Sequence, residues 1–146
     1  MSEPIEARRT IRLSSTMESV SEIEGLAEKI AIEAGLDEDA VFHVTMAVRE
    51  GAVNAVLHGN EYDPDKLVSF TWENTGKDLV FTLTDEGIGV DPAKLPDPRD
   101  PENLLRGTGR GIFLIRSMMD EVNFRQLHPG TELTLVKHLA APAQTS

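Results

Sequence analysis

The chain has 146 residues, enough for one ordinary domain, and its 40% hydrophobic and 27% charged residues are typical of a globular protein. Its formal net charge of −11 argues against a protein held on DNA by phosphate contacts, since such proteins need a basic surface. The absence of cysteine excludes disulfides, thiolate catalysis and cysteine-based metal sites.

The organisation of the chain predicts a single domain between two short tails. No apolar run approaches the roughly 20 residues that a membrane-spanning helix needs, and the N-terminus lacks the order of a secretion signal. We therefore expect a soluble cytoplasmic protein with neither a nucleic-acid nor a membrane partner. The small and polar residues of segments 1–9 and 140–146 predict flexible ends around a domain at 10–139.

The first half of the chain predicts a strand followed by two helices. Thr10–Leu13 is a short β-like run. Ser15, with a glutamate three residues later, has the spacing of a capping box and is expected to begin a helix that Gly35 ends. Asp37 is a candidate cap for a second helix, which we expect to stop near His58-Gly59-Asn60.

The second half alternates strand pairs with a long loop and a helix. Two β-like runs come first, then a segment rich in proline, aspartate and glycine, then a helix and a closing hairpin; these are Leu67–Trp72, Leu79–Thr84, Asp85–Gly111, Ile112–Met119, Glu121–Leu127 and Thr131–His138. Strands grouped in pairs between helices predict an α/β fold. We expect a two-layer α/β sandwich whose mixed, mostly antiparallel sheet has helices on one face.

Three clusters of residues are candidates for chemistry, and the first lies on the second helix. Glu50 and Asn54 are four residues apart and so share one face of that helix. An amide oxygen can ligate Mg²⁺ beside a phosphate, while a carboxylate can take a proton from a nucleophile. The same two residue types are also common as solvated helix residues, so this pair alone does not decide the function.

The second cluster follows the predicted strand that ends at Thr84. Asp85-Glu86-Gly87-Ile88-Gly89 places a carboxylate at a strand end before two glycines, Gly87 and Gly89. Such glycines let the backbone approach a flat ligand while the carboxylate accepts hydrogen bonds, for example from the amino group of adenine. A turn in which glycine supplies a positive φ is the alternative interpretation.

The third cluster, Arg106-Gly107-Thr108-Gly109-Arg110-Gly111, stands directly before the predicted helix. Alternate glycines at a helix N-terminus expose several N–H groups, which is a common way to bind phosphate. The sequence is neither a Walker A motif nor G-x-G-x-x-G. A flexible glycine-rich loop is the alternative interpretation here.

In this order and spacing the three clusters resemble the GHKL, or Bergerat, ATP-binding fold of gyrase-type ATPases, chaperone ATPases and histidine kinases. The likeness is strongest to the small bacterial anti-sigma factor serine/threonine kinases. Glu50 and Asn54, continuing to His58-Gly59, resemble the N-box, and the other two clusters resemble the two glycine boxes. Ile115–Val122 and Gly130–Leu135 resemble that subfamily's helix-to-strand passage and closing strand, so that the likeness extends over Thr10–Leu139.

The resemblance implies a role for each matching residue, with ATP and Mg²⁺ as cofactors. Glu50 would be the general base, Asn54 would hold the Mg²⁺, and Asp85 would contact the adenine amino group, with Thr131 joining through water. Gly87 and Gly89 would allow close approach to the nucleoside. The phosphate-binding residues would be Arg106, Gly107, Thr108, Gly109, Arg110 and Gly111.

The implied function is an anti-sigma factor kinase that sequesters a sigma factor and phosphorylates an anti-anti-sigma (STAS-type) protein on serine or threonine. The relatives also imply a homodimer. Two alternatives remain open: a nucleotide-gated binding module with little phosphotransfer, and an orphan histidine-kinase-like ATPase domain. The segment Val90–Arg106, with four prolines, is expected to be a nucleotide-sensitive lid over the phosphate site.

Overall fold

Five strands form one sheet and three α-helices cover one of its faces in the part of the chain that the structure describes. The structure is a computed structural model that describes residues 8–61, 63–87, 109–127 and 129–139. The strands are β1 (Arg9–Ser14), β2 (Leu67–Asn74), β3 (Asp78–Thr84), β4 (Glu121–Gln126) and β5 (Thr131–His138). The α-helices are α1 (Met17–Glu33), α2 (Glu38–Val53) and α4 (Gly109–Met118), and a π-helical turn, η1 (Asn54–Gly59), continues α2.

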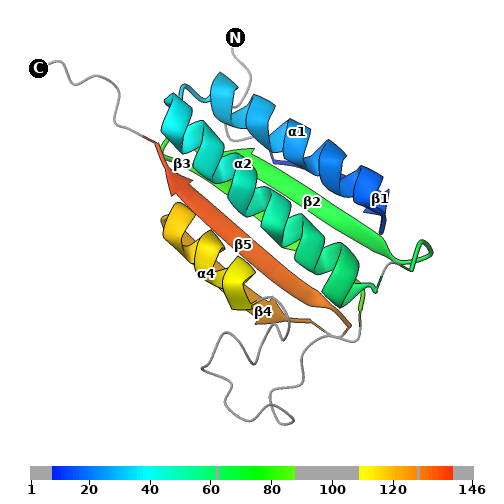
Figure 1. Ribbon diagram of the computed structural model, residues 1–146. Helices are drawn as coiled ribbons and strands as arrows, with labels where there is room; N and C mark the ends of the chain where they lie inside the picture. The colour runs from blue at the N-terminus through cyan, green and yellow to red at the C-terminus, as the bar shows by residue number, and fades with distance from the viewer. Residues whose placement is uncertain (1–7, 62, 88–108, 128, 140–146) are drawn as a thin grey trace, which may run out of the picture.

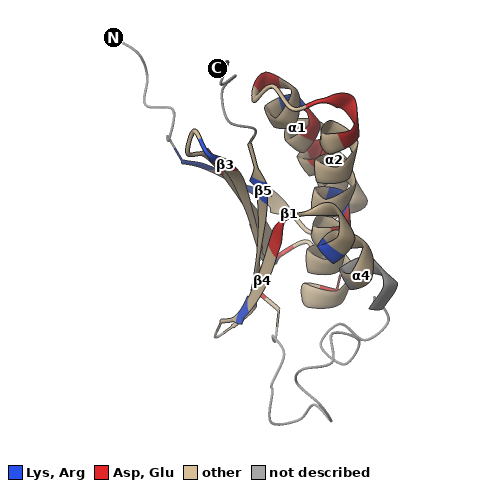
Figure 2. Ribbon diagram, turned by 90° about the vertical axis from the view of Figure 1, so that its left-hand side faces the viewer, with Lys and Arg blue, Asp and Glu red and all other residues tan. Residues whose placement is uncertain are grey.

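The strand order is β1-β2-β3-β5-β4, and all four pairings of the described strands are antiparallel (Figure 1). Figure 2 shows the sheet edge-on with every described helix on the same side. The predicted two-layer α/β sandwich is therefore confirmed. Its sheet was expected to be mixed and mostly antiparallel, and every pairing of the described strands is antiparallel. The strands β2 and β3, and likewise β4 and β5, are joined by short turns, and a hairpin of this kind always pairs its two strands antiparallel.

The core lies between the sheet and the helices. Alternate residues of the central strands, such as Phe70 and Phe81, point toward the helices and are fully buried. One stripe of α1 and one of α2 cover them with small aliphatic side chains. Gly51 lies where α2 crosses the sheet: a Cβ there would come within 2.6 Å of the Leu83 side chain and 2.9 Å of that of Leu133. The absence of a side chain thus lets α2 lie close to β3 and β5.

The ends of the helices agree only partly with the sequence predictions. Asp37 caps α2, as expected, by accepting a hydrogen bond from the Ala40 N–H at 2.8 Å. Ser15 does not cap α1: that residue is Thr16, whose hydroxyl oxygen accepts from the Ser19 N–H at 3.1 Å. The prediction failed because Ser15 is buried and its hydroxyl is already engaged, donating to the Lys66 carbonyl at 2.6 Å.

The last helix also begins earlier than predicted. We expected it to start at Ile112, but α4 begins at Gly109 and so includes the end of the third glycine-rich cluster. Glycine is a poor helix former, which is why the alternating glycines of this cluster predicted a loop here.

In the described part of the chain, none of the helices combines the length and the apolar character that crossing a membrane requires.

Asn60 joins three segments just after η1. Its side chain is fully buried, and its Nδ2 donates to the Ser15 Oγ at 2.8 Å and to the Leu67 carbonyl at 3.0 Å. Its Oδ1 accepts from the Glu86 N–H at 2.8 Å. The amide therefore connects the segment between β1 and α1, the start of β2 and the chain just beyond β3.

We predict that Asn60→Ala destabilises the unliganded protein strongly. The change leaves at least two buried groups without their partner, at about 1–3 kcal/mol each, so we expect a loss of at least about 2 kcal/mol. The measurement is urea denaturation, with Asn123→Ala on the exposed side of β4 as the matched control, which should change stability by less than about 0.5 kcal/mol. Equal stability of the two variants would contradict the role given to Asn60.

Candidate functional site

The helix that carries Glu50 and Asn54 changes its geometry at the second of these residues. Glu50 lies in the last turn of α2 and is partly exposed, whereas Asn54 is buried and begins η1. The turn ends with an i→i−5 hydrogen bond from the Asn60 N–H to the Ala55 carbonyl at 2.8 Å. Such π-helical turns are frequent at functional sites.

Asn54 has a buried amide for which the described residues offer no hydrogen-bond partner. Neither its Oδ1 nor its Nδ2 has a hydrogen-bond partner among the described residues, although both atoms are inaccessible to solvent. Buried side-chain amides are nearly always hydrogen-bonded, because an unpaired one costs free energy. Asn54 thus has the property expected of a residue that binds a group absent from the structure, and an amide oxygen is a suitable ligand for Mg²⁺.

The Asp85 carboxylate is the second buried polar group of the site, with 6% of the residue exposed. Its Oδ1 accepts from the Gly87 N–H at 3.0 Å and from the Thr131 N–H at 3.2 Å. The Asp85 N–H in turn donates to the Thr131 carbonyl at 3.0 Å. Burial raises the pKa of Asp85 above its ordinary value, although the two N–H groups and the charge of Lys66 act in the opposite direction.

Three glycines pack directly around Asp85. A Cβ on Gly59 would overlap the Asp85 carboxylate, and a Cβ on Gly130 would overlap the Asp85 carbonyl oxygen. A Cβ on Gly87 would overlap the Gly59 carbonyl, and Gly130 also has a φ of +104°. The end of the N-box stretch, the first glycine box and the start of β5 therefore meet at this carboxylate.

Three residues that line the site, Gly59, Asn60 and Gly130, were not among the site residues predicted from the sequence. Gly59 stood inside the N-box resemblance, and Gly130 stood only at the start of the stretch that resembles the family's closing strand. The signal available for both was that glycine falls next to a predicted site element. No local pattern could indicate Asn60, because its partners are 7 to 45 residues away along the chain.

The described members of the predicted site lie at one end of the helical layer. Figure 1 shows that α4 runs antiparallel to α2, so the N-terminus of α4 lies at the same end as η1. Gly109, Arg110 and Gly111 form the first turn of α4, where free N–H groups are available to an anion. The side chain of Arg110 lies outside the described residues, as do Gly89, Arg106, Gly107, Thr108 and the expected lid Val90–Arg106.

Comparison with known proteins gives consistent family relationships. The family described as histidine kinase-like ATPase domain matches residues 13–137. An anti-sigma F factor of Anoxybacillus flavithermus is 29% identical over 130 residues, which cover 86% of each chain. The serine-protein kinase RsbW of Staphylococcus epidermidis is 28% identical over 136 residues, or 88% of this chain and 85% of that protein.

A solved structure shares the fold. The crystal structure of the RsbU and RsbW domains of a Mycobacterium tuberculosis protein superposes with a TM-score of 0.66 at 17% identity. The match covers 94% of this chain and 34% of that longer chain. At this identity the likeness concerns the arrangement of strands and helices.

We predict that Asp85→Asn does not destabilise the unliganded protein at neutral pH. The amide oxygen still accepts from Gly87 and Thr131, and the variant no longer buries a charge. Because the folded-state pKa of Asp85 is raised, the carboxylate costs stability above that pKa. The cost disappears as the pH falls through the folded-state pKa toward the value of the unfolded chain.

The measurement is the free energy of unfolding of both proteins from neutral to acidic pH. The wild type should gain stability relative to Asp85→Asn as the pH falls through this window. A wild type that instead loses stability relative to the variant would contradict the raised pKa.

We also predict that Asn54→Leu stabilises the unliganded protein, by about 1–3 kcal/mol, because leucine has a similar shape and leaves no unpaired buried amide. Asn54→Asp is the matched contrast and should be destabilising at neutral pH, since it buries a charge in the same place. Thermal unfolding without nucleotide or Mg²⁺ measures both. A less stable Asn54→Leu protein would mean that the Asn54 amide is hydrogen-bonded in solution.

Proposed function

The chain belongs to the histidine kinase-like ATPase domain family, and we propose that it is an ATP-dependent anti-sigma factor serine/threonine kinase. Its relatives named as anti-sigma F factor and serine-protein kinase RsbW support this proposal, since they match over most of both chains. The structural observation that carries it is the pair of buried polar groups, Asn54 and Asp85, at one end of α2 and β3. We place the kinase domain at residues 10–139.

Adenine recognition is assigned to Asp85 and the residues around it. Its Oδ1 is held by two N–H groups, which leaves the other oxygen to accept from the amino group of adenine. Thr131 lies against Asp85 and is suitably placed to join through water. Gly59 lies against the carboxylate and Gly87 against the Gly59 carbonyl, at positions where a Cβ would overlap, so these glycines allow the close backbone packing that holds the carboxylate in place for a base.

The triphosphate and Mg²⁺ are assigned to Asn54 and to the glycine-rich cluster before and within α4. No group of three or more His, Cys, Asp or Glu that could hold a metal occurs among the described residues. A cation here therefore needs nucleotide phosphate as well as the Asn54 amide, as is usual for Mg²⁺ at kinase sites. When bound, Mg²⁺ would neutralise part of the negative charge of the phosphates.

Glu50 is assigned as the general base. It stands one helical turn before Asn54 on the same face and, unlike Asn54, is partly exposed. The partner's hydroxyl can therefore reach it from solvent. Its carboxylate accepts the proton of the attacking serine or threonine, while Asn54 and the N–H groups of α4 orient the phosphates.

The proposed partners are a sigma factor, which the protein sequesters, and a STAS-type anti-anti-sigma protein, which it phosphorylates. The net charge of −11 fits a basic protein partner such as a sigma factor, whose DNA-binding surface must be positive. We also propose that the protein acts as a homodimer, which only the resemblance to its family implies. The lid Val90–Arg106 remains part of the proposal and lies outside the described residues.

We predict phosphotransfer from labelled ATP to the STAS-type protein encoded nearest to the gene of this chain, in the presence of Mg²⁺. Acid treatment identifies the product, because phosphoserine and phosphothreonine survive it and phosphohistidine does not. Glu50→Gln should keep ADP affinity and lower the rate by about 10²–10⁴, since it keeps the shape and loses the proton acceptor.

Binding variants serve as matched controls in the same assay. Asp85→Asn should weaken ADP by roughly ten- to hundredfold, the effect of losing one charge-assisted hydrogen bond. Asn54→Leu should lose the contribution of Mg²⁺ to ATP affinity. An acid-labile product would favour the histidine-kinase-like ATPase domain over the serine/threonine kinase. If the wild type binds ATP but forms no phosphorylated product, the nucleotide-gated binding module replaces the kinase. Full activity of Glu50→Gln would contradict the role of Glu50 as the general base.

A further inference from the structure

A groove on the outer surface of α1 and α2 has no part in the nucleotide site. It has a volume of about 460 Å³ and lies where the second half of α1 faces the first half of α2. Its apolar lining consists of Ile32, Leu36, Val41, Phe42 and Met46. We call this feature the α1–α2 groove.

Two of these apolar side chains are unusually exposed. Phe42 is 56% exposed and Ile32 is 59% exposed, whereas Leu36 and Val41 also pack against the core. Large apolar residues gathered in a hollow and surrounded by polar ones mark an interaction site more often than isolated exposed ones do. The α1–α2 groove therefore offers an apolar floor that a partner could cover.

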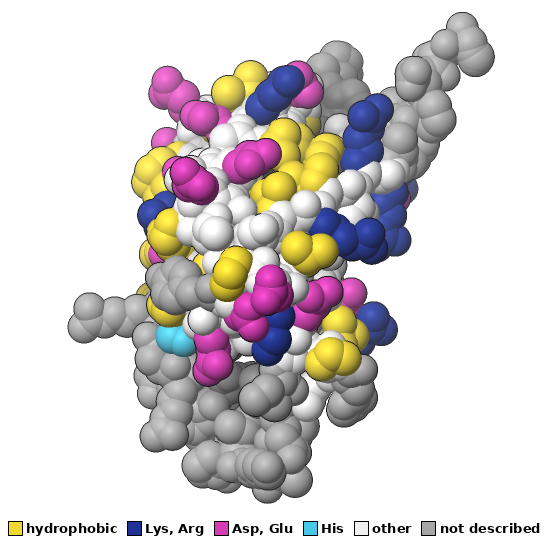
Figure 3. All heavy atoms as spheres, turned by 90° about the vertical axis from the view of Figure 1, so that its right-hand side faces the viewer, with side chains coloured by type: hydrophobic (Ala, Val, Ile, Leu, Met, Phe, Trp, Pro, Cys, Tyr) yellow, Lys and Arg dark blue, Asp and Glu magenta, His cyan; other side chains and the backbone are white. Residues whose placement is uncertain are grey.

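The rim of the α1–α2 groove is acidic. Glu24, Glu28 and Glu38 line it together with the apolar residues. Arg49 is already paired with Glu24 at 3.1 Å, and Lys29 is the only basic residue of α1. In Figure 3, acidic side chains lie over the helical layer, while Lys and Arg gather mainly on the sheet side. An occupant of this groove would thus gain from positive charge.

We propose that the α1–α2 groove binds a basic amphipathic helix of a partner protein. Grooves with an apolar floor accept the apolar stripe of such a helix, and the charges of the rim then meet the basic residues that flank the stripe. The same face of a second copy carries the same acidic rim and so does not complement this groove. The terminal segments 1–7 and 140–146 contain no basic side chain and so do not complement the rim.

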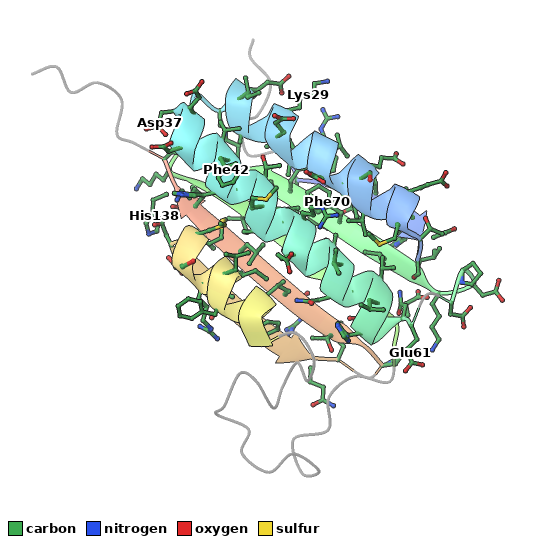
Figure 4. All side chains as sticks on the ribbon, viewed as in Figure 1. Lys29, Asp37, Phe42, Glu61, Phe70 and His138 are labelled. Atoms are coloured by element: carbon green, nitrogen blue, oxygen red, sulfur yellow. The ribbon has the colours of Figure 1, made fainter. Side chains whose placement is uncertain are left out.

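The α1–α2 groove lies along the first half of α2, whereas Asn54 of the nucleotide site follows the last residue of that helix. Asn54 comes 12 residues after Phe42 in the sequence, a separation of about 18 Å along the axis. Figure 4 places Phe42 near the Asp37 end of α2 and Glu61 at the other end. A helix in the groove therefore leaves the nucleotide site open, and the proposal does not depend on the protein being a kinase.

The test uses the full chain and a fluorescent synthetic peptide of about five turns, with leucine at i, i+3, i+4 and i+7 and lysine on the other face. A peptide of identical composition without the leucine stripe is the control for charge alone. The groove variants are Phe42→Ala and Glu28→Lys. Their matched controls are Phe113→Ala, 74% exposed on α4, and Glu22→Lys, an exposed residue of α1 that does not line the groove.

We expect saturable binding of the striped peptide that each groove variant weakens by at least about tenfold and each control variant by less than about twofold. Affinity should fall as salt rises, because the rim contributes through charge. ADP affinity and thermal stability should stay at wild-type values in all four variants, which separates this result from a failure of the proposed function. Equal binding of the striped and unstriped peptides, or equal affinity of Phe42→Ala and Phe113→Ala, would overturn the proposal.

Discussion

The close contact between the end of η1 and the chain beyond β3 is the constraint on which the rest of the site depends. Asn60 holds the two segments through the Glu86 N–H and also binds the segment before α1 and the start of β2. Gly59 then lies against the Asp85 carboxylate with no space for a Cβ. Because α2 packs closely on the sheet at Gly51, the end of η1 and the end of β3 meet at one site although they are distant in the sequence.

The two central polar residues of this site are poor choices for stability alone. Asn54 has a buried amide with no partner among the described residues, and Asp85 has a buried carboxylate whose pKa is raised. We expect the unliganded protein to be no less stable with a neutral or apolar residue of similar shape at either position. Such local conflicts between folding and residue choice are concentrated at functional sites, where a ligand supplies the missing interactions.

The distribution of charge divides the surface into parts with different uses. Among the described residues, exposed acidic side chains lie along α1 and the start of α2, including the rim of the α1–α2 groove, whereas β1 presents Arg9 and Arg12. The N-terminus of α4 provides N–H groups for an anion at the end of the layer where Asn54 and Asp85 lie. A protein with net charge −11 can therefore bind a polyanionic nucleotide through local backbone groups and still attract basic proteins over its helices.

The sequence by itself determined the fold class and the family, and the site residues that it names remain a prediction. Alternating and helical hydrophobic patterns, the Asp37 cap and the order of N-box and glycine boxes are local signals, and the structure and the comparisons agree with them. The family resemblance predicts that Thr131 and Asp85 act at one site, and in the structure the Thr131 N–H donates to the Asp85 carboxylate, although the two residues are 46 apart in the sequence.

Only the tertiary structure decided the remaining features, because they depend on partners far away in the chain. Ser15 has the spacing of a helix cap, yet its hydroxyl is bound to Lys66 and Asn60, so that Thr16 caps the helix instead. The unpaired amide of Asn54, the burial of Asp85 and the overlap that keeps residue 59 a glycine follow from the packing of α2 on the sheet. A hydrophobic pattern specifies which face of an element is buried, whereas the neighbours of each polar atom on that face are set when the elements pack together.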